Sequence, residues 1–173
     1  VVESTKADII RFFEVPEDKI SVIYQPVNKV YYDIEEQKQT QPTEAYMLYV
    51  GSVNSRKNLL GIVKAMELLP TDLQLPLTIV GGGGNYKRQV EQYIEEHHME
   101  HLFRWTTAID SVSLKQLYAN ATLFLYPSFY EGFGLPVVEA LLSSCPVLTS
   151  NTSSLPEAGG PSSLQVDPRN IEE

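Results

Sequence analysis

Between residues 46 and 149, short apolar runs alternate with longer segments in which apolar residues recur at helical spacing. The strand-like runs cover 46–50, 76–81, 102–105, 122–126 and 146–149, and the helix-like segments cover 58–69, 84–98, 112–119 and 135–143. Strands that alternate with helices in this way indicate βαβ units joined into a parallel sheet. The pattern therefore predicts an α/β fold, with a Rossmann-like parallel sheet flanked by helices.

The residues before position 45 follow a different pattern, which predicts an edge unit ahead of the sheet. A helix is expected from a cap at Ser4 to about Phe13, and Pro16 ends it. A strand is expected over 20–24. Residues 25–44 turn polar, and we interpret them as an exposed connection between this unit and the main core.

The carboxyl ends of parallel strands meet at one edge of a sheet, and ligands collect at that edge in open α/β folds. The loops that follow residues 50, 81, 105, 126 and 149 are therefore expected to share one rim. Most of the residues with recognisable chemistry stand in these loops. The rim is thus the predicted place of a binding site.

A loop that enters a helix after residue 126 carries the strongest chemical signal. Gly132 and Gly134 allow the backbone to approach a ligand closely, and Pro136 suits the first position of a helix. Unpaired amides at that helix start attract phosphate or hydroxyl oxygens, whereas Glu131 and Glu139 accept hydrogen bonds. A sugar nucleotide is one ligand that offers both kinds of group.

Two cations, Arg56 and Lys57, stand in the loop after residue 50, directly before a predicted helix start. They gain nothing structural from that position, because a positive charge opposes the dipole of a helix N-terminus. Beside helix amides they can bind a diphosphate and stabilise the charge that grows on it when a sugar departs. The pair predicts a diphosphate site.

The glycines at 81–84 also follow a predicted strand. They do not form the G-x-G-x-x-G pattern of a dinucleotide site, because Tyr86 stands where the pattern requires its last glycine. Two interpretations stay open for Gly82 and Gly83, a tight turn and backbone contact with a ligand.

Together these segments resemble the signature of the nucleotide-sugar-dependent retaining glycosyltransferases with the two-domain GT-B architecture, the group 1 family. The likeness extends in the family's order over 49–59, 78–83, 126–142 and 152–168. It implies that residues 1–173 are a C-terminal, nucleotide-sugar-binding domain, truncated at its C-terminal end. The acceptor-binding N-terminal domain would be absent.

The resemblance also implies roles for individual residues. Lys57 would contact the donor phosphates, and Arg56 would substitute for the Arg that many members carry where this chain has Ser52. Glu131 would lie near the donor sugar, and Glu139 would bind the ribose hydroxyls. With Glu131, Lys57 and Arg56 as the catalytic set, the remaining donor-binding residues would be Gly51, Gly82, Gly83, Gly132, Phe133, Gly134 and Leu135.

A glycosidase pair is the competing interpretation of Glu131 and Glu139. Eight helical residues span about 12 Å. The carboxylates of glycosidases lie only roughly 5 to 9.5 Å apart. The spacing therefore argues against a glycosidase, although a bent loop would shorten it.

Composition narrows the choice of partners. The net charge of -9 disfavours nonspecific attraction to nucleic acid or anionic lipid. The single Cys145 excludes an internal disulfide and is expected to fill the core. The sequence has no apolar run of membrane-spanning length and no signal peptide. The family's usual substrates imply a cytoplasmic setting, and they are compatible with peripheral attachment of the full-length protein at the inner membrane face.

No cofactor and no metal are expected beyond the donor itself. The sequence contains no Asp-x-Asp motif of the kind that holds a divalent cation on a diphosphate. His97 and His101 have the i, i+4 spacing of metal ligands, but histidines near a helix end also suit the helix dipole. We favour the second interpretation.

The parent protein is therefore expected to move a sugar from a nucleoside diphosphate to a hydroxyl acceptor in polysaccharide or other glycan assembly. The Arg56-Lys57-Asn58 variant favours GDP-mannose slightly, by family association. The missing domain would bind the glycan or lipid-linked acceptor, so the isolated domain should bind nucleotide weakly and transfer nothing. Two alternatives stay open, a GT-B epimerase that acts on a nucleotide sugar alone and a noncatalytic sugar-nucleotide-binding subunit.

Overall fold

The computed structural model describes residues 2–32 and 44–173, and it contains a parallel sheet. All strand pairs run parallel, in the order β3-β2-β1-β4-β5-β6. The α/β prediction is therefore confirmed. The strands are β1 (Met47–Val50), β2 (Leu77–Val80), β3 (Phe103–Thr106), β4 (Leu123–Tyr126), β5 (Val147–Ser150) and β6 (Leu164–Val166).

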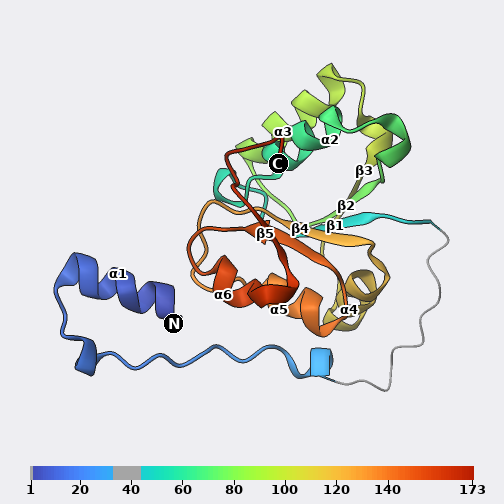
Figure 1. Ribbon diagram of the computed structural model, residues 1–173. Coiled ribbons are helices and arrows are strands. Elements are labelled where there is room, and N and C mark those ends of the chain that lie inside the picture. The colour runs from blue at the N-terminus through green and yellow to red at the C-terminus, as the bar shows by residue number, and fades with distance from the viewer. Residues whose placement is uncertain (1, 33–43) are drawn as a thin grey trace.

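Helices cover both faces of the sheet, as Figure 1 shows. One face carries α2 (Leu59–Leu68) and α3 (Asn85–Glu96), and the other carries α4 (Ser111–Asn120), α5 (Leu135–Leu142) and α6 (Leu155–Gly159). The helices and strands predicted between residues 46 and 149 begin and end within two residues of these bounds. The predicted alternation thus places the β1, β2, β4 and β5 loops at one rim.

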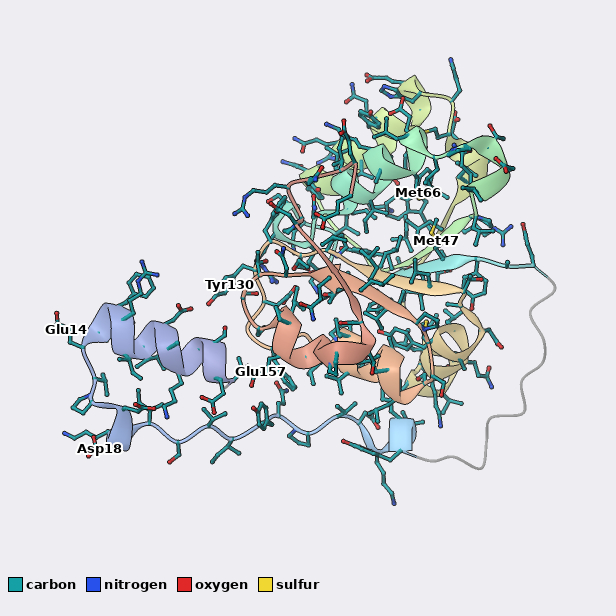
Figure 2. The ribbon with its side chains drawn as sticks, in the orientation of Figure 1. Glu14, Asp18, Met47, Met66, Tyr130 and Glu157 are labelled. Carbon is teal, nitrogen blue, oxygen red and sulfur yellow. The ribbon has the colours of Figure 1, made fainter. Side chains whose placement is uncertain are left out.

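Alternate strand residues divide the core into two clusters. Met47 and Tyr49 face α2, and Figure 2 shows Met47 and Met66 between β1 and that helix. Leu48 and Phe124 face the opposite side, toward α4 and α5. Because both faces are covered, the strands can be apolar on both sides, which explains their continuous apolar runs.

The N-terminal segment differs from its prediction in two respects. Helix α1 (Glu3–Phe13) begins before Ser4, and Val2 occupies the N-cap position without a side-chain cap. The predicted strand at 20–24 is also wrong, because these residues form no strand. Apolar alternation alone does not make a strand, since its backbone groups need a neighbouring strand to pair with, and the described residues offer none there.

The N-terminal segment nevertheless contacts the main domain through Glu157. The amide of Glu3 lies 3.2 Å from Glu157 Oε1, and the Tyr24 hydroxyl donates to the same oxygen at 2.6 Å. The ring of Tyr24 lies 6.1 Å from that of Phe133. Figure 2 shows Glu157 beside the N-terminal end of α1. The segment therefore adjoins the loop that precedes α5.

The connection at 25–44, predicted to be exposed, is partly buried. A 3-10 helix, η2 (Lys29–Tyr32), lies within it, and Tyr31 is buried against the main domain. The Tyr31 ring meets the Tyr118 ring edge to face at 6.1 Å. Val27 and Val30 pack on the same core cluster as Tyr31, and the composition argument missed this anchor because it averaged these residues with the polar ones around them. Residues 33–43 of the predicted connection lie outside the described part of the chain.

Candidate functional site

The loops after β1, β4 and β5 meet at the rim. The amide of Phe129, in the loop after β4, donates to the Arg56 carbonyl in the loop after β1 at 2.8 Å. From the loop after β5, the Thr152 hydroxyl donates to the Phe129 carbonyl at 3.1 Å. The parallel sheet thus brings three sequence-distant segments together, as predicted.

A short 3-10 helix, η3 (Ser55–Lys57), presents the two cations. Asn54 caps it, because its side-chain oxygen accepts the Lys57 amide at 3.2 Å. Asn58 then adopts a left-handed conformation with φ of 58°, which Asn tolerates better than most residues, and α2 begins at the next position. The Asn58 side chain donates to the Pro168 carbonyl at 2.8 Å. The Asn of the motif is therefore structural.

Lys57 is buried, with 8% of its surface exposed. Its ammonium contacts the Tyr126 hydroxyl and lies 3.6 Å from Glu131 Oε1. Burial lowers the pKa of Lys57, and the charge of Glu131 opposes that shift. A buried ammonium requires such partners. The structure thus brings Lys57 and Glu131 together, as the motifs suggested.

Arg56 is the more accessible cation, with 44% of its side chain exposed. It lies 2.8 Å from Glu131 Oε2 and also donates to the Tyr130 carbonyl. The hydrogen bond to Glu131 raises the pKa of Arg56. Arg56 therefore joins the same cluster while it faces solvent.

Serine and threonine hydroxyls fix the loop that carries Glu131. Ser128 donates to Glu131 Oε1 at 3.1 Å, and the Glu131 amide donates to the Ser153 hydroxyl at 3.0 Å. The Ser154 hydroxyl lies 2.8 Å from the Glu131 carbonyl and 3.0 Å from the Phe133 carbonyl. The loop after β5 thus acts as a scaffold for the loop after β4.

The start of α5 offers unused backbone donors. Within residues 2–32 and 44–173, the amides of Gly132, Phe133, Gly134 and Leu135 donate no hydrogen bond to the protein. Gly134 has φ of 98°, and an added Cβ would lie 2.7 Å from a Leu155 methyl group. A side chain at this position would therefore disturb the turn that carries these amides.

The glycines of the β1 and β2 loops have different surroundings. A Cβ on Gly51 would lie 2.7 Å from the Lys57 ammonium, so Gly51 makes room for that cation. A Cβ on Gly83 would lie 2.3 Å from the Val53 carbonyl. Gly82 has open space around it. Packing thus explains Gly83 without a ligand, whereas Gly82 is exposed backbone at the rim.

Glu139 lies in a second polar cluster, one turn into α5. Its Oε2 accepts a hydrogen bond from the Tyr118 hydroxyl at 3.3 Å, and the Tyr31 hydroxyl also hydrogen-bonds to it. Burial raises the pKa of Glu139, and both hydroxyls oppose the shift. In the described part of the chain no contact joins Glu139 to Glu131.

The spacing of about 12 Å that argues against a glycosidase pair assumes that one helix runs from Glu131 to Glu139. Glu131 precedes the first residue of α5, so a continuous helix does not connect Glu131 to Glu139. Each carboxylate has its own partners, cations in one case and tyrosine hydroxyls in the other. The arrangement does not resemble two carboxylates that face one glycosidic bond.

His97 and Cys145 have local partners. The ring of His97, at the C-terminal end of α3, stacks on Tyr93 at 3.9 Å and lies 3.9 Å from Glu67. No group of metal-binding side chains is present among residues 2–32 and 44–173. Cys145 is buried, and burial raises its pKa to about 11, as suits the predicted core role.

Tyr126 and Ser128 belong to the cluster around Glu131, although the sequence motifs did not indicate it. Tyr126 ends an apolar strand, so its pattern is that of a core residue, and its hydroxyl gives no signal in hydrophobic periodicity. Its place at the last position of β4, on the rim, is the clue that was available. The serines 153 and 154 belonged to the recognised motif, but their role as loop scaffold was not predicted.

The sequence profile described as Glycosyl transferases group 1 matches residues 32–173. The chain belongs to this family. The O-antigen chain mannosyltransferase B of Escherichia coli is 36% identical to this group 1 glycosyl transferase domain over 99% of the chain and 48% of the relative. The O-antigen chain mannosyltransferase RfbU of Salmonella typhimurium is 30% identical over 95% of the chain and 45% of the relative. The chain thus spans about half the length of these relatives.

Solved structures agree on the fold of this group 1 domain. A glycosyltransferase from Rickettsia africae superposes with a TM-score of 0.86 at 21% identity, over 99% of this chain and 49% of that one. The resemblance to the group 1 glycosyltransferase family that the motifs indicated is confirmed. In the described residues, no helix combines the length and the apolar character needed to cross a membrane.

Proposed function

We propose that this domain binds the nucleotide sugar of a retaining glycosyltransferase, which transfers a sugar to a hydroxyl acceptor. Family membership and the names of the mannosyltransferase relatives support a transferase over an epimerase or a noncatalytic subunit. Because the chain covers about half of those relatives, the acceptor is assigned to a further domain of the parent protein.

One observation carries the proposal. A buried Lys57 and an accessible Arg56 adjoin the loop whose backbone amides, from Gly132 to Leu135, have no acceptor within the described part of the chain. Cations beside free amides at a helix start form a site for phosphate oxygens. Glu131 and the Tyr126 hydroxyl partner the buried ammonium of Lys57, so a positive charge is held at the rim where an anionic ligand can meet it.

The chemistry follows from this geometry. Lys57, Arg56 and the amides near Phe133 and Gly134 would stabilise the negative charge on the departing diphosphate. Glu131 would lie beside the donor sugar, where its carboxylate keeps both cations in place. Positioning and charge stabilisation supply much of the catalysis, and no protein nucleophile is required. Departure and attack on the same sugar face would give retention.

The second polar cluster would recognise the ribose. Among the described residues, the hydrogen-bond partners of Glu139 are neutral hydroxyls, those of Tyr118 and Tyr31. Ribose hydroxyls can replace such partners without moving a charge. Exposed backbone at Gly82 would supply a further donor contact.

GDP-mannose is the proposed donor, and O-antigen or a related glycan is the proposed product. The relatives named as O-antigen mannosyltransferases and the Arg56-Lys57-Asn58 motif support this choice. A cytoplasmic setting, with peripheral contact at the membrane, remains a prediction for the parent protein.

Calorimetric titration of GDP, UDP and ADP into the 173-residue chain tests the proposal. GDP should bind most tightly, and Glu139→Gln should weaken binding of every nucleotide. Failure of all three nucleotides to bind would contradict a donor site, and preference for UDP would contradict GDP-mannose alone.

Turnover experiments separate the transferase from its alternatives. The 173-residue chain should transfer no mannose, whereas the full-length parent should transfer it to an added hydroxyl acceptor. Incubation of the parent with GDP-mannose and no acceptor should leave the sugar unchanged. Isomerised sugar would instead identify an epimerase. Full transferase activity of the parent protein after Lys57→Ala would contradict the proposed role of Lys57 in stabilising the departing diphosphate.

A further inference from the structure

Tyr126 is the last residue of β4, and its hydroxyl lies inside the cation cluster. Only 1% of the residue is exposed. We propose that Tyr126 is a positioning residue, whose hydroxyl bridges Lys57 and Glu131 and thereby fixes the Lys57 ammonium at the rim. This inference rests on the proposed function of the rim as a diphosphate site.

The direction of each hydrogen bond follows from the groups involved. A lysine ammonium has only donors and an ionised carboxylate has only acceptors, whereas a phenol has one proton and two lone pairs. The Tyr126 proton is therefore donated to Glu131 Oε1 at 3.0 Å, and the phenol oxygen accepts from the Lys57 ammonium. No other assignment satisfies all three side chains.

A lysine side chain needs this support more than an arginine does. Its charge sits at the end of a flexible four-carbon stem, and it lacks the planar fork that orients a guanidinium. Backbone at Gly51 limits the Lys57 ammonium on one side, because a Cβ there would lie 2.7 Å from the nitrogen. The Tyr126 hydroxyl and Glu131 limit it on another. The ammonium is thus held in one place before any ligand arrives.

Core packing does not account for the hydroxyl. Phe124, two positions earlier on the same face of β4, stacks on Tyr126 with ring centroids 5.6 Å apart. A phenylalanine ring therefore fits this layer. A buried hydroxyl costs free energy unless it is hydrogen-bonded, and here both of its partners are charged. The hydroxyl of Tyr126 consequently serves the ion pair.

The test compares Tyr126→Phe with Tyr46→Phe in the 173-residue chain. Tyr46 is also a buried tyrosine, but its hydroxyl donates to the Leu117 carbonyl, away from the rim. The first readout is the pKa of Lys57 without nucleotide, from NMR of the labelled lysine side chain, with Lys57→Met to assign the signal. The second readout is the affinity for GDP and for pyrophosphate.

Tyr126→Phe removes an acceptor for the charged form of Lys57, so the Lys57 pKa should fall. The titratable groups that face this ammonium, Glu131 and Arg56, are unchanged in the variant. GDP and pyrophosphate should each bind about tenfold more weakly, a loss of about 1.4 kcal/mol, and the loss should grow at alkaline pH. Tyr46→Phe should change neither the Lys57 pKa nor the affinities.

A Lys57 titration that is identical in wild type and Tyr126→Phe would overturn the inference. So would a loss of affinity that persists when Tyr126→Phe is added to Lys57→Met, because a positioning residue has nothing to act on in that background. A wild-type chain that binds neither GDP nor pyrophosphate would contradict the proposed function instead. The Lys57 titration would still decide the role of Tyr126.

Discussion

Glu131 and Glu139 come from one sequence motif, yet the fold gives them opposite surroundings. Glu131 lies between two cations and also accepts hydrogen bonds from Tyr126 and Ser128. Within residues 2–32 and 44–173 the hydrogen-bond partners of Glu139 are neutral tyrosine hydroxyls, and burial raises its pKa. Carboxylates that a sequence pattern presents as a pair can therefore have very different surroundings in the fold.

This difference determines which protein contacts of each carboxylate a ligand can replace. Loss of Glu131 would leave the buried Lys57 charge unpaired, which is costly unless a phosphate takes the place of the carboxylate. Replacement of a tyrosine hydroxyl at Glu139 by a ribose hydroxyl exchanges like for like. The cation cluster is thus suited to an anion, and the Glu139 cluster to a polyol.

The largest expected effect comes from Glu131→Ala. Because this change leaves the buried Lys57 without its counter-ion, we expect a loss of about 3 kcal/mol in the free energy of unfolding. Glu139→Ala, the matched change in the other cluster, should cost about 1 kcal/mol, since only neutral hydroxyls lose a partner. Urea unfolding followed by circular dichroism measures both.

A second variant sharpens this prediction. The double change Glu131→Ala with Lys57→Met should recover part of the lost stability, because the uncompensated charge is gone. Equal losses for the Glu131 and Glu139 variants, or no recovery in the double variant, would remove the contrast between the clusters.

Lys57→Met should have the next largest effect, on binding. The loss of a charge-assisted contact should weaken GDP binding by about 30-fold, or about 2 kcal/mol. Arg56→Met, at the exposed cation, should weaken it by only about threefold, because solvent screens that charge. Calorimetry provides both affinities. A larger loss for Arg56 than for Lys57 would mean that the accessible cation dominates.

Glu139→Gln should weaken recognition of the ribose without weakening recognition of the diphosphate. GDP should bind about fivefold more weakly, as expected for loss of about 1 kcal/mol in hydrogen bonding, whereas pyrophosphate affinity should not change. Lys57→Met, in contrast, should weaken both ligands. Weaker pyrophosphate binding by the Glu139 variant would show that the two clusters are not separate.

The smallest expected effect is on the pH dependence of stability. The folded pKa of Glu139 is raised above its ordinary value of 4.5. The folded protein therefore binds this proton more tightly, so the contribution of Glu139 is most favourable below that value and declines as pH rises through the folded pKa. Relative to Glu139→Gln, wild type should lose stability over this rise, as thermal unfolding would report. A constant difference between the two proteins would contradict the prediction.

The sequence predicted the fold well where the pattern was repetitive. Alternating apolar runs located the central strands and helices, and the parallel arrangement placed Lys57 and Glu131 at one rim. The strand predicted at 20–24 was wrong, because a strand needs a neighbouring strand to pair with, and local periodicity carries no information about that neighbour. The expectation that Tyr31 is exposed was wrong for a related reason, because its burial depends on Tyr118, which lies far along the chain.

Individual contacts at the site were harder to predict. The motif indicated which residues gather, but it did not indicate that Tyr126 joins Lys57 to Glu131 or that tyrosines hold Glu139. Both depend on side-chain directions that only the packed structure provides. The glycines divide in the same way, because Gly83 is explained by packing against Val53 and Gly51 by the space that Lys57 needs.

Nucleoside diphosphate is proposed to bind between the cation cluster and the start of α5. A GDP titration of the ¹⁵N-labelled chain, followed by amide NMR, tests it most directly. The largest chemical-shift changes are expected at the amides of Gly132, Phe133, Gly134 and Leu135, and these changes should be absent in Lys57→Met at the same GDP concentration. Shifts confined to other parts of the molecule, with these amides unmoved, would contradict it.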